Sequence, residues 1–152
     1  MSISIISIML VSLAALAAVC VRRIPEGQVY SLRRFGGHTR FVGAGMHFML
    51  PLIERVSHKM SLTGSTIEVS GALSNGENYA ASVYYQVLDP QRADQVIECV
   101  DALLSDQTTR LLAGDSVPPE TAERRIWLKQ GLNSEVRERG LLVTRIDLRS
   151  AA

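Results

Sequence analysis

The chain has 152 residues, with sixteen Lys and Arg against fifteen Asp and Glu and a net charge of +1. This balance excludes the strongly basic character expected of a nucleic-acid-binding domain, and the length suits one domain with an appendage. The two cysteines, Cys20 and Cys99, are too far apart in sequence for a disulfide framework or a CxxC metal site. We interpret both as buried apolar thiols.

The first 23 residues differ sharply in composition from the remainder. Residues 3–21 contain no charge, no Pro and no Gly, and as a helix they just reach across a hydrocarbon core of about 30 Å. We therefore predict a transmembrane anchor over residues 1–23 and a soluble domain over residues 24–150. The residues expected to define the anchor and its flank are Ile3, Leu10, Leu16, Val21, Arg22 and Arg23.

Two features indicate whether this segment stays attached as an anchor or is cleaved. Arg22 and Arg23 follow the apolar run directly, and basic flanks tend to stay cytoplasmic, so we predict a single-pass membrane protein with its soluble domain in the cytoplasm. The alternative is a cleaved signal peptide, with Ala15-Leu16-Ala17 as the cleavage site. The run is longer than the usual signal-peptide core and no Lys or Arg precedes it, which favours the anchor.

The first part of the soluble region has the pattern of strands and turns. Residues 28–35 alternate as an amphipathic strand does, Gly36-Gly37 marks a tight turn, and residues 38–42 are expected to return as the second strand of a hairpin. Further strands are expected over residues 55–62, 66–70 and 79–88.

A second apolar run covers residues 46–53 and contains Pro51. It is too short to cross a bilayer, so we interpret it as core, with a shallow dip into a membrane as the functional alternative.

The second part of the soluble region has two helical patterns and a closing strand. Apolar residues recur at helical spacing from Ala93 to Leu112, and a second helix is expected from Glu120 to Arg139, ended by Gly140. Residues 141–148 alternate as a strand. This order predicts an α+β fold with a mostly antiparallel sheet packed by two helices. The predicted buried residues are Val83, Val87, Val96, Val100, Leu104 and Leu132.

No residue pattern indicates catalysis. His38, His47 and His58 have no metal-binding spacing, and neither a nucleophile elbow nor a phosphate-binding loop is present in the sequence. Cys99 has Glu98 and Asp101 as acidic neighbours, which disfavour a thiolate. We therefore predict no enzyme activity, no catalytic or metal-binding residues and no cofactor.

Several segments of the chain together resemble the stomatin, prohibitin and flotillin superfamily, known as the SPFH or band 7 domain, and its bacterial stomatin-like branch in particular. The resemblance covers roughly residues 21–148. It rests on the stretches IPEG at 24–27, RFG at 34–36, GMHF at 45–48, YYQVLDP at 84–90, QTTR at 107–110 and the strand after Gly140. The residues that match the family pattern are Gly27, Arg34, Gly36, Gly45, His47, Phe48, Pro51, Asp89, Pro90, Arg110 and Gly140.

The chain also departs from the family pattern. Ala44 stands where a proline is usual, and the sequence given ends at Ala152 without the Ala- and Glu-rich coiled coil typical of the family. On that ground we expect small oligomers, or co-assembly with a longer family member, and no large ring.

The resemblance implies a membrane scaffold or assembly protein that organises membrane microdomains or regulates membrane proteins. Its expected partners are membrane lipids, other copies of the chain or a longer relative, and a membrane protease or channel, with no nucleic acid. The alternative function, which follows from signal cleavage, is an exported domain that binds a ligand or a partner protein.

Overall fold

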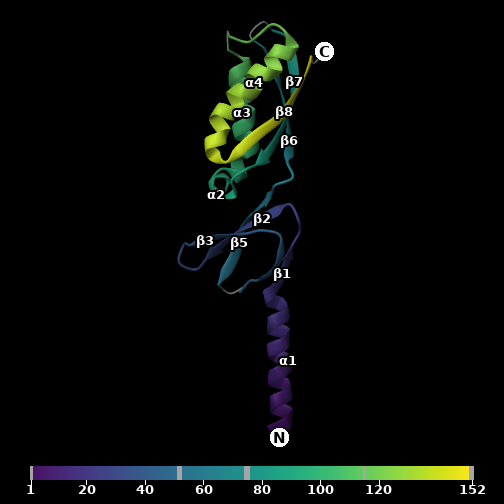
Figure 1. The fold of residues 1–152 in the computed structure, drawn as a ribbon, viewed down its shortest axis with the longest axis vertical. Coiled ribbons are helices and arrows are strands. Elements are labelled where there is room, and N and C mark those ends of the chain that lie inside the picture. Colours follow the sequence, from purple (N-terminus) through teal and green to yellow (C-terminus); the bar gives the residue numbers. More distant parts are fainter. Residues whose placement is uncertain (1, 51–52, 74–75, 115, 151–152) are drawn as a thin grey trace. The chain divides into compact units, whose positions relative to one another are not determined.

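A computed structural model describes residues 2–50, 53–73, 76–114 and 116–150 (Figure 1). The chain forms two compact units, residues 1–59 and residues 60–152, which we call unit 1 and unit 2. The expected α+β class with antiparallel sheets is confirmed. The expected single sheet is wrong, because the strands are distributed over three sheets.

Unit 1 contains one helix followed by short strands. Strand β1 pairs with β4, and β2 is the central strand of a second sheet ordered β3-β2-β5. The elements are α1 (Ser2–Cys20), β1 (Val21–Ile24), β2 (Gln28–Arg34), β3 (Thr39–Val42), β4 (Gly45–Phe48) and β5 (Glu54–Ser61), whose last two residues belong to unit 2.

The expected hairpin is confirmed. Strands β2 and β3 pair antiparallel, and the turn between them places Gly36 and Gly37 at φ values of +110° and +86°, a region that glycine enters at no steric cost. Strand β2 differs from the amphipathic expectation, because four successive residues, Val29–Leu32, are buried. Because successive side chains of a strand point to opposite faces of the sheet, both faces of β2 are covered at these positions.

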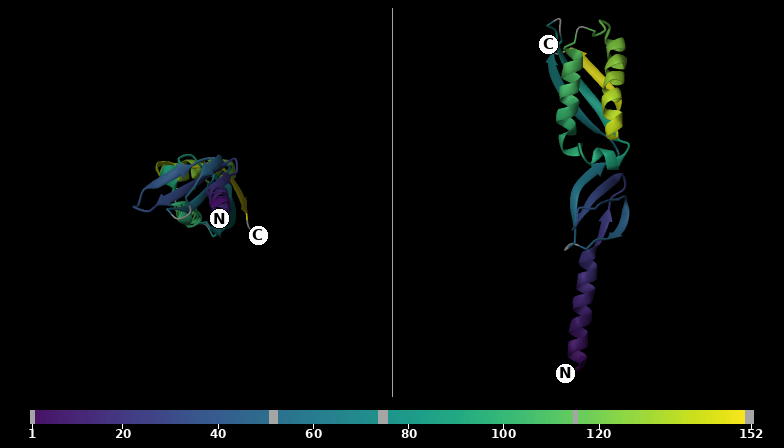
Figure 2. Two further views of the ribbon diagram at one scale, coloured as in Figure 1. Left: turned by 90° about the horizontal axis from the view of Figure 1, so that it is seen from below. Right: turned by 90° about the vertical axis from the view of Figure 1, so that its left-hand side faces the viewer.

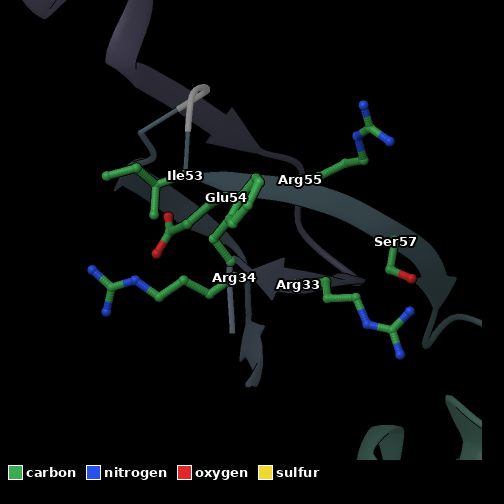
Figure 3. A pocket seen from close by; sticks show the side chains of 7 residues that line it. Arg33, Arg34, Ile53, Glu54, Arg55 and Ser57 are labelled. Carbon is green, nitrogen blue, oxygen red and sulfur yellow. The ribbon is translucent and has the colours of Figure 1, made fainter. Parts of the chain in front are cut away.

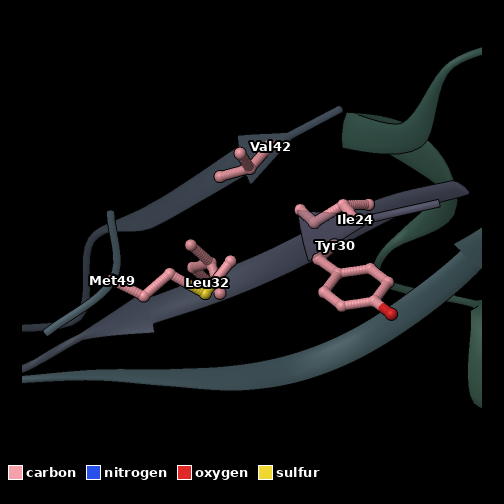
Figure 4. Close-up of a cluster of buried hydrophobic side chains, with 5 residues drawn as sticks. All are labelled: Ile24, Tyr30, Leu32, Val42 and Met49. Atoms are coloured by element: carbon pink, nitrogen blue, oxygen red, sulfur yellow. The ribbon is translucent and has the colours of Figure 1, made fainter. Parts of the chain in front are cut away.

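The core of unit 1 is small. Its members come from strands β1, β2 and β3 and from the segment after β4 (Figure 4). They are Ile24, Tyr30, Leu32, Val42 and Met49, with Val56 packed against them.

Unit 2 is a three-stranded antiparallel sheet, ordered β6-β7-β8, with two helices side by side on one face (Figure 2). Leu104 of α3, Leu128 and Leu132 of α4, and Val83 of β7 are all fully buried. The elements are β6 (Ser65–Ala72), β7 (Asn78–Val87), α2 (Pro90–Ala93), the 3-10 turn η1 (Ile97–Cys99), α3 (Val100–Leu112), α4 (Thr121–Val136), the 3-10 turn η2 (Arg137–Arg139) and β8 (Leu141–Ser150).

The first expected helix of this unit is wrong as a single element. It divides into α2, η1 and α3, because Val96 and Cys99 have φ values of −119° and −117°, outside the α-helical range. Val96 is consequently only half-buried, whereas the other five predicted core residues are buried. The second helix also ends early, at Val136, and Ile126 on this helix is exposed.

A side chain on α4 bonds to strand β8 beside an irregularity of the strand. The β7–β8 register shifts between Tyr84 and Tyr85, which leaves Thr144, next to Val143, without a partner residue on β7. The Asn133 amide donates to the Val143 carbonyl at 3.1 Å, and its oxygen accepts from the Val143 N–H at 2.8 Å. Helix α4 is thereby bonded as well as packed to the sheet.

Candidate functional site: the apolar helix and the basic surface of unit 1

Helix α1 carries apolar side chains that no other described part of the chain covers. Nine large apolar residues between Ile5 and Val19 are each 57% to 72% exposed. They include the predicted anchor residues Leu10 and Leu16, whereas the side chain of Ile3 lies outside the described residues. A helix that is apolar on all sides is typical of a buried or lipid-embedded environment.

The expected helix in this segment is confirmed, but two details of the prediction change. The helix ends at Cys20, and Val21, Arg22 and Arg23 belong to strand β1, with Arg22 opposite His47. In the described part of the chain, no helix has both the length and the apolar character that a membrane crossing requires. The expected crossing by residues 3–21 stays a prediction.

The end of α1 is joined to a second exposed apolar surface. Val21 lies directly opposite Phe48 in the β1–β4 pair, and the Met49 N–H donates to the Cys20 carbonyl at 2.8 Å. Farther along, the Ile53 N–H donates to the Leu50 carbonyl at 2.9 Å, and the Phe35 N–H donates to the Ile53 carbonyl at 3.0 Å. We call this exposed set the junction patch: Val21, Phe35, Phe48, Leu50 and Ile53.

The junction patch overturns the expectation that residues 46–53 are core. Met49 is buried, but Met46, Phe48, Leu50 and Ile53 are exposed. Among the described strands, β4 pairs with β1 alone, and its exposed side chains are not covered by another layer of the described structure. Pro51, which belonged to this prediction, lies outside the described residues.

Next to the junction patch, neighbouring strands β2 and β5 present three arginines. Arg33, Arg34 and Arg55 line a cleft of about 560 Å³ together with Phe35, Ile53, Glu54 and Ser57. All three arginines are exposed. In the close-up of this cleft, the Arg33 and Arg34 side chains extend in opposite directions, and Arg55 extends from β5 (Figure 3). The arginines therefore spread along a surface and do not converge on one point.

Unit 2 has a second cleft, of about 340 Å³, whose lining includes Tyr79, Thr121, Arg124 and Arg149. The guanidinium group of Arg124 in this cleft is bonded within its own unit, unlike the arginines of unit 1 in the described part of the chain. The Arg124 guanidinium donates to the Pro118 and Pro119 carbonyls, each at 2.9 Å. Those bonds hold Arg124 against its own chain, so a structural role accounts for it.

The glycines expected from the family pattern have conformational roles. Gly27, Gly36, Gly45 and Gly140 all have positive φ. Gly140 is the left-handed cap after η2, and a Cβ there would meet the Asp89 carbonyl. These four glycines therefore set the backbone conformation where they stand, which is a structural role.

The other residues of the family pattern are divided between turns and surface. Asp89 caps α2 by accepting from the Gln91 N–H at 2.9 Å, and Pro90 is the first residue of that helix. His47 Nε2 lies 3.0 Å from the Gly43 carbonyl. Arg34, Phe48 and Arg110 are exposed. Among these, the structure brings only Arg34 and Phe48 to the surface of unit 1 described above.

The two cysteines have different environments. Cys20 is buried, as expected. Cys99 is exposed and its Sγ lies 3.4 Å from the Val96 carbonyl, so the expectation that it is buried is wrong. The break between α2 and α3 explains this, because it turns residue 99 outward.

The distribution of charge is a feature that the whole-chain composition conceals. Residues 1–59 contain seven Lys and Arg against two Asp and Glu, a net charge of +5, whereas residues 60–152 contain nine against thirteen, a net charge of −4. Counting charge separately for the two parts of the sequence would have revealed this asymmetry. The total of +1 averages it away.

The chain matches no known protein-family model. The resemblance to the stomatin, prohibitin and flotillin superfamily therefore stays a prediction.

Proposed function

We propose that this chain is a membrane-anchored scaffold or assembly protein of the stomatin and prohibitin type, held at the membrane by α1. The observation that carries the proposal is the exposure of large apolar side chains on α1. Burying a single large apolar side chain contributes about 1.5–3 kcal/mol, so nine of them provide a strong drive out of water.

The junction patch supports the same proposal from a separate part of the sequence. Phe48 and Leu50 adjoin the end of α1 through the β1–β4 pair and the bond between Met49 and Cys20. If α1 lies in lipid, these residues reach the interfacial layer, which accommodates aromatic and aliphatic side chains. The exposed residues of the 46–53 run thus favour the shallow dip into the membrane that was the alternative to a core.

The finer form of the proposal is a single-pass protein with unit 2 in the cytoplasm. It rests on Arg22 and Arg23, which follow the helix and are exposed, and on the tendency of such residues to remain cytoplasmic. A scaffold of this kind would act by self-association, or by association with a longer relative or a membrane protease. It would require no active site.

Membrane fractionation of cells that express the full chain tests the anchor. The native chain should stay in the membrane pellet through an alkaline carbonate wash. Ala14→Arg places a charge in the middle of α1 at a cost of roughly 2.5–3.5 kcal/mol for insertion, and should shift the chain towards the soluble fraction. Ala14→Leu is the matched control and should stay in the pellet.

Two results would count against this function. Quantitative release of the native chain by carbonate would refute the anchor. A mature protein that begins near Ala18 would support the exported, partner-binding alternative, because Ala15-Leu16-Ala17 is the expected cleavage site.

A further inference from the structure

The basic residues of unit 1 outnumber its acidic residues by seven to two. Unit 1 has six arginines, at positions 22, 23, 33, 34, 40 and 55. Ion pairs among the described residues include those of Arg92 with Asp89 and of Arg145 with Asp147, both in unit 2, and none of them is formed by an arginine of unit 1. Lys59 of unit 1 stacks on Tyr30, with 5.5 Å between its Nζ and the ring centroid. The arginines of unit 1 therefore keep their charge available for an external anion.

The position of these arginines beside the junction patch indicates which kind of anion they bind. Arg34 directly precedes Phe35, which is 89% exposed, and Arg55 follows Ile53 by two residues. The cleft that these residues line thus combines apolar and cationic side chains. A free anion in water gains nothing from an exposed phenyl ring, whereas a lipid surface offers phosphate groups and acyl chains at adjacent depths.

The geometry of the arginines favours a surface over a single small anion. Arg33 and Arg34 extend in opposite directions from adjacent positions on β2 (Figure 3), so they cannot clamp one phosphate together. Glu54 lies within the same cleft and would repel an anion placed at its centre. Phosphates distributed over a membrane can meet each guanidinium separately, which fits the spread arrangement.

From this arrangement we infer that unit 1 recognises the anionic phosphate headgroups of a lipid bilayer through Arg33, Arg34 and Arg55, with Phe35 and Ile53 entering the interface beside them. The inference rests on the proposed function, because α1 must bring this surface to the membrane. It adds a lipid preference that the anchor alone does not have. Each basic residue at an anionic surface raises the association constant on the order of fivefold, so three residues raise it roughly a hundredfold.

The test uses the full chain with a reporter at the β2–β3 turn. His38 is exposed there, and its carbonyl accepts from the Arg34 N–H at 2.9 Å. A chain with His38→Cys and Cys99→Ser, labelled with a polarity-sensitive fluorophore, is reconstituted with vesicles of phosphatidylcholine alone or with phosphatidylcholine and phosphatidylglycerol. Flotation measures the anchor, and the emission shift measures contact of unit 1 with the surface.

We expect flotation with both vesicle types and a blue shift only with phosphatidylglycerol, reduced strongly by 0.5 M salt because screening weakens exposed charges. The triple variant Arg33→Gln, Arg34→Gln and Arg55→Gln should float normally but lose the shift. The matched control changes three exposed arginines of unit 2 to Gln, at positions 110, 137 and 139, and should keep it. The triple variant Arg33→Lys, Arg34→Lys and Arg55→Lys should also keep the blue shift, because it keeps the charge. This result separates loss of charge from misfolding.

The outcomes separate this inference from the function on which it rests. Flotation with an equal shift in both vesicle types, or a shift that survives the Gln variant, overturns the headgroup recognition and leaves the anchor intact. Failure to float with neutral vesicles overturns the anchor, while an Arg-dependent shift in anionic vesicles would still support the recognition. A third outcome is a blue shift that depends on a high density of protein on the vesicle and does not need phosphatidylglycerol. That result would mean that the arginines bind the acidic unit 2 of a second copy, and it would overturn the inference.

Discussion

Units 1 and 2 handle their apolar and charged residues in opposite ways. In unit 2, the large side chains that face the sheet are fully buried, and Arg92, Arg124, Arg125 and Arg145 each bond to a carboxylate or a backbone carbonyl. Unit 1 has a small core, an exposed apolar helix and arginines that have no ion pair among the described residues. Unit 2 thus buries most of its large apolar side chains and bonds four of its arginines, whereas unit 1 leaves an apolar helix and its arginines exposed to their surroundings.

This difference predicts where substitutions should affect folding and where they should affect association. Substitutions in unit 2 should change stability, and those on the surface of unit 1 should change membrane binding with little effect on stability. Trp127, the single tryptophan, lies in α4, so its fluorescence reports the unfolding of unit 2 within the full chain.

The largest effect on stability is expected for Leu104→Ala. Leu104 is fully buried between α3 and the sheet, and removing such a side chain costs about 2–5 kcal/mol through lost burial and a residual cavity. Denaturant unfolding of the full chain in mild detergent, followed by Trp127, measures this loss. Ile126→Ala removes a side chain that is 60% exposed and should change the free energy of unfolding by less than about 0.5 kcal/mol. Equal losses would contradict the packing of unit 2.

The next effect concerns the bond between α4 and β8. Asn133→Ala removes the side-chain amide that bonds both the N–H and the carbonyl of Val143, and leaving buried polar groups unpaired costs about 1–3 kcal/mol. Asn133→Asp is the matched variant, because it keeps the acceptor for the N–H and loses the donor. We expect its loss to lie between those of the native chain and the Ala variant. Thermal unfolding that does not distinguish the Ala variant from the native chain would show that the bonds between Asn133 and Val143 do not stabilise unit 2.

Gly140→Ala should destabilise unit 2 by about 1–2 kcal/mol, because the native φ of +77° disfavours a Cβ by that amount. The nearby Asp89 carbonyl adds a steric cost. The control is Gly43→Ala in unit 1, where φ is not positive and no atom lies within 4 Å of an added Cβ. Circular dichroism melts of both variants should show a lower midpoint for the first alone.

The smallest expected effect is a loss of folding stability at alkaline pH. Burial of the Tyr85 hydroxyl raises its pKa above the ordinary value of 10.0, as does the neighbouring Asp101, to which it donates at 3.1 Å. A pKa that is higher in the folded chain means that this contribution to stability is complete below about pH 10. It is lost as the pH rises through the folded value.

Tyr85→Phe isolates this contribution. The variant should cost about 1 kcal/mol at neutral pH and should lose stability less steeply than the native chain above about pH 10. Parallel slopes for the two proteins in that range would remove Tyr85 as the responsible group. Tyr84→Phe is the comparison for a neighbouring tyrosine that is half-buried and has no such bond to a carboxylate.

The sequence predicted the local elements well where turn residues and periodicity agree. The β2–β3 hairpin, strand β7, helix α4 and the cap at Gly140 follow from Gly-Gly, the Val- and Tyr-rich run, the three- and four-residue spacing and the final glycine. Helix α1 follows from its apolar composition. In each of these cases the signal is contained within the element itself.

The errors arose where burial depends on neighbours that are remote in sequence. The 46–53 run is apolar, and apolar composition alone does not reveal that β4 would have only β1 as a partner. Periodicity continued through residues 94–99, although the backbone there leaves the helix. The basic surface of unit 1 was missed because net charge was considered for the whole chain and because adjacent strands bring Arg33 and Arg55 together.

Hydrogen exchange of the full chain, compared in detergent-free buffer and with phosphatidylcholine and phosphatidylglycerol vesicles, tests the contrast between the units most directly. The account predicts that the lipid slows exchange of peptides from α1 and of peptides that contain Phe35, Phe48 and Ile53, whereas peptides from residues 60–150 exchange at unchanged rates. Slowing confined to unit 2, or rapid exchange throughout α1 with lipid present, would contradict it.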